Sequence, residues 1–115
     1  MRRVALYRGA ACLLPSAMAA LSWGARLRGL LFRRPLARDG SEGMLISPCG
    51  SVHTFGMTYP IDVVFLDRAG TVLRVCESLR PWRSAMQRGA RSVIEFHGGA
   101  ARLHSIKAGD VIAWK

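Results

Sequence analysis

Short apolar runs separated by turn residues recur along this chain and predict a protein built mainly of β-strands. The clearest run covers residues 61–66, which are apolar on both faces except at Asp62 and therefore predict a central buried strand. The turn Asp67-Arg68-Ala69-Gly70 follows it and predicts a hairpin with the next run. Further strands are expected at residues 4–7, 12–14, 44–46, 52–55, 71–76, 92–96 and 111–114.

Two helices complete the expected fold. Residues 22–31 predict an amphipathic helix, with Ser22 as its N-cap and leucines on one side. Its polar side and C-terminal end carry arginines, which suit the helix dipole there; these are Arg26, Arg28, Arg33 and Arg34. Residues 99–106 predict a short C-terminal helix. The expected fold class is mainly β (α+β), as a small β-sandwich or partly closed barrel with these two helices.

The length and charge of the chain limit its function classes. The 115 residues suit one domain, 1–115, with no second domain. The net charge of +10 could attract an anionic membrane surface or a nucleic acid. Fifteen of the 17 basic residues are scattered arginines, however, and we find no nucleic-acid recognition element, so nucleic-acid binding is not favoured. A basic protein that associates peripherally with an anionic membrane remains an alternative.

The N-terminus leaves the compartment open. Residues 9–25 form an uncharged run of 17 residues interrupted by Pro15, which is too short for a transmembrane span. The start of the chain could nevertheless be either a structural strand or a cleaved export signal. The three cysteines, an odd number, do not indicate a disulfide framework. We therefore expect a cytoplasmic protein, with export through an N-terminal signal as the alternative.

Several segments together resemble a known protein family. They are residues 26–31 (RLRGLL), 42–45 (EGML), 48–57 (PCGSVHTFGM), 60–67 (PIDVVFLD), 90–95 (ARSVIE) and 109–110 (GD). This pattern resembles the bacterial and archaeal domain-of-unknown-function family number 192, also called uncharacterised protein family 0127. The resemblance implies a small β-sandwich-like domain over residues 4–114, with no established activity. It also implies that residues 4–20 belong to the domain.

Candidate chemistry concentrates between residues 49 and 62. Cys49, His53 and Met57 are soft metal ligands, but their four-residue spacing separates them by about 13 Å in a strand, so no metal or other cofactor is expected. Cys49, His53 and Asp62 also supply the residue types of a thiol-dependent enzyme. Their proximity cannot be inferred from spacing, and the sequence provides no helix start at Cys49 to activate the thiol.

Asp62 is the most informative polar residue because burying an unpaired carboxylate is costly. We expect the backbone amides of the 57–60 turn, or Arg28 from the helix, to hold it. Glu95, His97 and His104 are expected to face solvent. We predict a non-enzymatic module that binds a small polar ligand, a peptide or a protein in a groove near residues 49–62. The expected ligand-binding residues are Arg28, His53, Met57, Asp62 and the exposed-loop residue Trp82.

Overall fold

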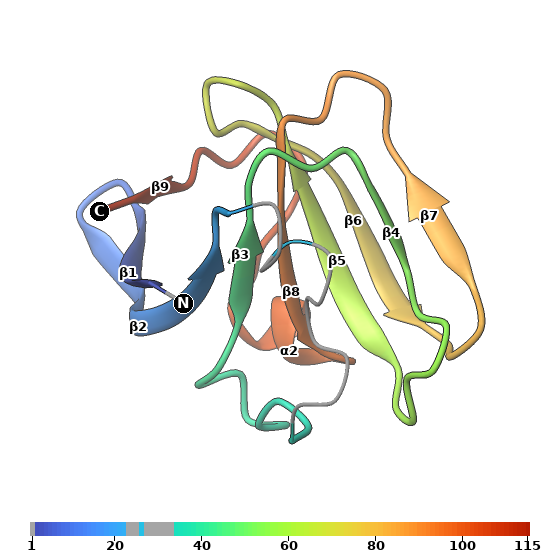
Figure 1. Ribbon diagram of the computed structural model, residues 1–115. Coiled ribbons are helices and arrows are strands. Elements are labelled where there is room, and N and C mark those ends of the chain that lie inside the picture. Colours follow the sequence, from blue (N-terminus) through green and yellow to red (C-terminus); the bar gives the residue numbers. More distant parts are fainter. Residues whose placement is uncertain (1, 23–25, 27–33) are drawn as a thin grey trace.

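The computed structural model describes residues 2–22, 26 and 34–115, and most of its regular structure is β-strand (Figure 1). The elements within these residues are β1 (Arg2–Arg8), β2 (Ala11–Ala20), β3 (Met44–Ile46), β4 (Ser51–His53), β5 (Ile61–Leu66), β6 (Val72–Leu79), β7 (Ser84–Met86), β8 (Ser92–His97), α2 (Ala100–Leu103) and β9 (Ala113–Trp114). The expected mainly β fold with a short C-terminal helix is confirmed. The expected basic helix at residues 22–31 lies outside the described residues except for Ser22 and Arg26. Strand β7 was not predicted.

Seven strands form one sheet in the order β6-β5-β8-β3-β2-β1-β9, and β4 pairs with β7 in a separate ribbon (Figure 1). All pairs are antiparallel except β2 with β3. The large sheet is not closed into a barrel. An isolated bridge between Thr71 and Val111 nevertheless links the segment before β6 to the segment before β9.

The expected first hairpin is present, but β2 is longer than predicted because it continues through Pro15. Val4 lies opposite Ala17 and Leu6 lies opposite Leu14, so β2 carries one extra residue at this point. Such a bulge tolerates proline, since a residue left out of the pairing needs no ladder N–H. The hairpin contributes Val4, Leu6 and Leu14 to the core.

The two faces of the large sheet carry different apolar clusters. The helix-side cluster packs around α2 and includes residues from β1, β2, β5, β8 and the C-terminal segment. The ribbon-side cluster lies on the opposite face, where Val52 of β4 and Ala85 of β7 pack against it. Its buried members are Ala20, Leu36, Met44, Ile46, Ile61, Val63, Phe65 and Val93. Strand β5 supplies both faces by simple alternation.

Asp62 points from β5 to the helix side and is fully buried. It lies opposite Phe96 of the helix-side cluster. One carboxylate oxygen accepts the Ser78 N–H at 2.8 Å. The other accepts the N–H groups of Gly99 at 3.0 Å and Ala101 at 2.9 Å. Backbone amides therefore hold this carboxylate, as expected in kind, but they come from β6 and the start of α2 instead of the 57–60 turn.

A bulge in β6 makes the contact with Ser78 possible. Ile61 lies opposite Leu79 and Val63 lies opposite Cys76, so β6 has an extra residue between these pairs. Ser78 takes a positive φ of 50° there. The irregularity directs its N–H away from the regular ladder and toward the carboxylate of Asp62.

The expectation that Glu95 and His97 face solvent is wrong. Both point to the ribbon side of β8, where Glu95 is 5% exposed and His97 is 7% exposed. The Tyr59 ring stacks on the His97 imidazole at 5.0 Å between centroids. Glu95 lies opposite Met44 and Val63 in the neighbouring strands. Burial in these apolar surroundings disfavours the carboxylate and raises the pKa of Glu95 to about 7.

Replacing Asp62 with Ala should destabilise the fold strongly. The substitution leaves three amides without their acceptor, two of them at the start of α2. We expect a loss of about 3 kcal/mol or more in the free energy of unfolding, measured with urea. Asp67→Ala is the matched control, because Asp67 also accepts two backbone amides, from Ala69 and Thr71, but in an exposed turn. Equal losses in the two variants would contradict the structural role given to Asp62.

Replacing Glu95 with Gln should change how stability depends on pH. The folded protein holds the Glu95 proton more tightly than the unfolded chain, because the pKa is about 7 in the fold against an ordinary 4.5. The contribution of Glu95 to stability is therefore complete below pH 4.5 and is lost as the pH rises through 7, by about 3 kcal/mol in total.

Urea unfolding of the wild type and Glu95→Gln across this pH range measures the effect, since the other titrating groups are common to both. Parallel stability curves would show that Glu95 is not buried in its neutral form.

Candidate functional site

Three ring-bearing side chains lie side by side at the end of the β4–β7 ribbon. The His53 and Phe55 ring centroids are 5.0 Å apart, and the Phe55 and Trp82 rings stack at 5.8 Å with an interplanar angle of 21°. Phe55 is 49% exposed and Trp82 is 64% exposed. We call His53, Phe55 and Trp82 the aromatic row. Exposed aromatic side chains gathered in this way are typical of binding surfaces.

Buried Thr54 fixes the loop that carries Trp82. Its hydroxyl donates to the carbonyl oxygens of Arg80 at 2.6 Å and Arg83 at 3.1 Å, and accepts the Arg83 N–H at 2.9 Å. Its backbone adds bonds to both sides of the loop, accepting the Trp82 N–H and donating to the Arg83 carbonyl oxygen. A single residue at the end of β4 thus sets the conformation of residues 80–83.

The backbone at Trp82 is held in a conformation that costs energy. Its φ is 62°, in the left-handed region that side chains with a Cβ rarely adopt. The bonds that Thr54 makes to Arg80, Trp82 and Arg83 hold the loop in this conformation. Strain held in place by surrounding structure is characteristic of functional sites.

A groove of about 590 Å³ lies beside the aromatic row, between β6 and the β4–β7 ribbon. Its walls combine apolar side chains with His53, Arg74 and the thiol of Cys76. The Arg74 guanidinium also donates to the Met86 carbonyl oxygen at 3.3 Å, which links β6 to β7. The apolar lining residues of the groove are Val52, Leu79, Ala85 and Met86.

The surroundings of the groove are basic. Arg74 lines it, and the exposed residues Arg80 and Arg83 are next in sequence to the lining residues Leu79 and Ser84. No acidic side chain lines the groove among the residues that the structure describes. The nearest acid on β6, Glu77, is paired with Arg102 at 3.0 Å. This surface therefore combines apolar and aromatic contacts with an excess of positive charge.

The structure brings together two of the residues singled out from the sequence. His53 and Trp82 both belong to the aromatic row, joined by Phe55, which the sequence analysis missed. The sequence does not identify Phe55 as a surface contact, because a single phenylalanine after a short strand is equally consistent with a core residue. Met57 lies half-buried against the ribbon-side cluster, and Asp62 faces the opposite side of the sheet. Arg28 lies outside the described residues.

Cys49, His53 and Asp62 are not assembled into a catalytic group in this structure. Asp62 lies on the helix side of the sheet, where its carboxylate accepts hydrogen bonds from three backbone amides. Cys49 packs against the ribbon-side cluster on the opposite face. The Cys49 thiol donates to the Ser51 carbonyl oxygen at 3.0 Å, and burial raises its pKa. The Nδ1 atom of His53 accepts the Phe55 N–H at 3.3 Å. These contacts favour a neutral thiol over a nucleophilic thiolate.

Among residues 2–22, 26 and 34–115, no group of three or more His, Cys, Asp and Glu side chains is placed to hold a metal ion. Within them also, no helix is long and apolar enough to cross a membrane.

Two curated proteins are similar to part of the chain. The chain is 38% identical over 65 residues to a UPF0127 protein of Pyrococcus abyssi and 36% identical over 66 residues to one of Thermococcus sibiricus. Each match covers 56% of this chain. The matched stretch spans only about half the length of these relatives, 55% and 42% respectively.

Two crystal structures have a similar fold. One is a protein of unknown function from Novosphingobium aromaticivorans, with a TM-score of 0.80, covering 97% of this chain and 84% of that one. The other, from Sinorhizobium meliloti, is described as a proposed transcription regulator and has a TM-score of 0.79, with coverages of 97% and 92%. Both are 22% identical in sequence, so they show the fold alone.

The family comparison covers far more of the chain. The model of DUF192, described as uncharacterized ACR, COG1430, matches residues 10–114. The chain therefore belongs to the DUF192 family of uncharacterised proteins, in agreement with the resemblance carried by its sequence motifs.

Proposed function

We propose that the chain is a single-domain, non-enzymatic binding module that uses the aromatic row and the adjoining groove to hold an extended peptide segment of a partner protein. The observation that carries the proposal is Trp82, which is exposed, strained and pinned by Thr54. Retaining a strained, exposed tryptophan lowers stability, and partner contact is the benefit that offsets this loss.

The arrangement of layers supports this proposal. We infer a small open sandwich in which the β4–β7 ribbon is the second layer over the large sheet, since Val52 and Ala85 pack on the ribbon-side cluster. The groove lies where this second layer meets the edge strand β6. A ligand there contacts rigid strands on both sides, which limits the entropy lost on binding.

The chemistry of the surface indicates which peptides it binds. Leu79 and Met86 offer an apolar seat for one side chain, and the aromatic row offers flat contact beside it. Arg74, Arg80 and Arg83 favour acidic residues next to that anchor. The expected ligand is therefore a peptide with one apolar or aromatic residue between acidic neighbours.

His53 and Trp82 are the ligand contacts in this proposal, with Phe55 added, while Met57 packs against the ribbon-side cluster. We do not extend the proposal to catalysis, because Cys49, His53 and Asp62 would need contacts different from those they make. The alternative of a peripheral membrane protein depends on residues 22–34, most of which lie outside the described residues.

Selection from a random peptide library tests the proposed specificity. We expect the wild-type protein to enrich peptides with an apolar residue flanked by acids, and Trp82→Ala to bind the selected peptides at least about tenfold more weakly. Leu103→Ala is the matched control, because Leu103 is equally exposed but lies on α2, away from the aromatic row. Fluorescence anisotropy with labelled peptides gives the affinities.

Three results would contradict the proposal. They are equal binding by the wild type and Trp82→Ala, enrichment of basic peptides, and binding of labelled oligothymidylate at this surface in place of any peptide. The last result would identify a single-stranded nucleic-acid site instead.

The strain at Trp82 has its own test. Trp82→Gly and Trp82→Ala both remove the indole, but only glycine adopts a φ of 62° without steric cost. We expect Trp82→Gly to be the more stable of the two by about 1 kcal/mol in urea unfolding. If Trp82→Ala were equally stable, the loop would relax freely and Thr54 would not hold it under strain.

A further inference from the structure

A second cavity, of about 260 Å³, lies at the other end of the ribbon-side sheet face, between the β1–β2 hairpin and residues 34–43. Its walls include Arg3 of β1, Ser16 and Met18 of β2, and Arg34, Leu36 and Glu42 from the segment before β3. The sheet order puts four strands, β5, β8, β3 and β2, between the edge strand of the groove, β6, and β1, so this cavity is separate from the surface proposed above.

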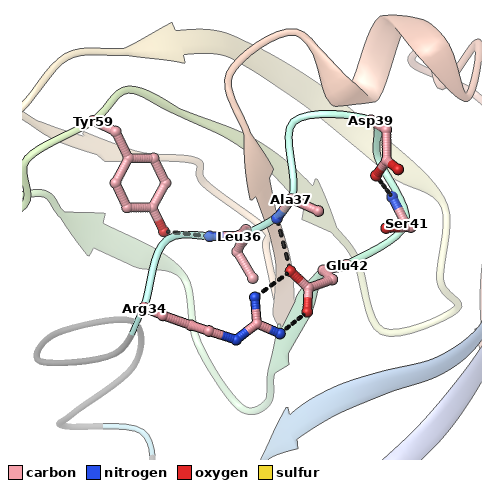
Figure 2. A network of polar contacts seen from close by, with 7 residues as sticks. All are labelled: Arg34, Leu36, Ala37, Asp39, Ser41, Glu42 and Tyr59. Carbon is pink, nitrogen blue, oxygen red and sulfur yellow. Dashed lines mark hydrogen bonds and ion pairs between the residues drawn. The ribbon is translucent and has the colours of Figure 1, made fainter.

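One wall of the cavity is a fixed ion pair. Both nitrogens of the Arg34 fork bond the two carboxylate oxygens of Glu42, the Nη1–Oε1 pair at 3.0 Å (Figure 2). The Glu42 carboxylate also accepts the Ala37 N–H at 2.8 Å. Tyr59 accepts the Leu36 N–H with its hydroxyl at 3.3 Å, so the segment is held from two sides (Figure 2). Arg34 and Glu42 therefore neutralise each other and shape the wall.

The opposite wall carries the positive charge of Arg3, which is attracted to Glu42 but makes no direct ion pair with it. Arg3 lies opposite Met18 in the sheet, so the two side chains share the ribbon-side face. No carboxylate in the described part of the chain forms an ion pair with Arg3. Arg3, Arg34 and Glu42 together leave the cavity with one net positive charge.

We propose that this cavity binds a small organic monoanion, a carboxylate that pairs with Arg3 and packs its apolar part against Met18 and Leu36. One negative charge completes the charge balance, and arginine binds carboxylates through parallel N–H bonds. The Ser16 hydroxyl in the same wall can donate a further bond to the ligand. Small size and mixed polar and apolar walls exclude a large polyanion.

Titration with isobutyrate, followed by the backbone amide NMR shifts of Met18, Ala37 and Gly43, tests the site. We expect saturable shifts at these residues with isobutyrate and none with the neutral isostere isobutyramide. Arg3→Gln should weaken isobutyrate binding by about tenfold or more. Arg2→Gln is the matched control and should change it by less than about twofold, because Arg2 lies opposite Ala19 and faces the helix side of the sheet.

Glu42→Gln provides an independent test, because it raises the net charge of Arg3, Arg34 and residue 42 from one positive charge to two. This variant should bind inorganic phosphate about fivefold or more tightly than the wild type does. The proposal is overturned if isobutyrate gives no saturable shifts at these amides, if isobutyramide binds equally well, or if Arg2→Gln and Arg3→Gln weaken binding alike. Because the library selection uses a different surface, failure here leaves the peptide proposal intact.

Discussion

The fold depends on one buried carboxylate that is held by backbone amides and, within residues 2–22, 26 and 34–115, by no ion pair. Asp62 holds the amide of Ser78 in β6 and those of Gly99 and Ala101 around the start of α2, so three segments remote in sequence meet at one side chain. The backbone at Gly98 packs closely against Pro60 and Ser78 around this side chain. A Cβ on Gly98 would lie 3.2 Å from the Pro60 carbonyl oxygen and 3.3 Å from the Ser78 hydroxyl. The otherwise apolar strand β5 therefore tolerates an acid at this position because the local backbone solvates it.

The sequence predicted features that depend on local pattern, and it failed where a long-range contact decides. The apolar run at residues 61–66 was sufficient to predict a buried strand. The presence of Asp62 within that run predicted a buried polar contact. Glu95 shows the limit of prediction from local pattern, because the sequence of one strand does not indicate whether other segments cover its second face. That face is covered by Met44 and Val63 beside it and by Leu36 and Tyr59 above it, which belong to separate segments.

The candidate site was foreseen in part for the same reason. His53 and Trp82 could be selected as single residues by type and position, but their neighbourhood depends on the pairing of β4 with β7, and β7 is too short and polar to be recognised. The partner of Phe55 lies 27 positions along the chain and reaches it only because Thr54 folds residues 80–83 back. No local pattern encodes that arrangement.

Residues 113–115 also complete β1. Lys115 exchanges two backbone hydrogen bonds with Ala5, and Trp114 lies opposite Leu6, while the Thr71–Val111 bridge joins the same tail to the middle of the chain. During synthesis, one side of β1 therefore stays unpaired until residues 113–115 have been made. Contacts of such long range form slowly and expose apolar strands in the meantime. The outer edge of the N-terminal hairpin is consequently open to aggregation for longer than strands whose partners lie close in the sequence.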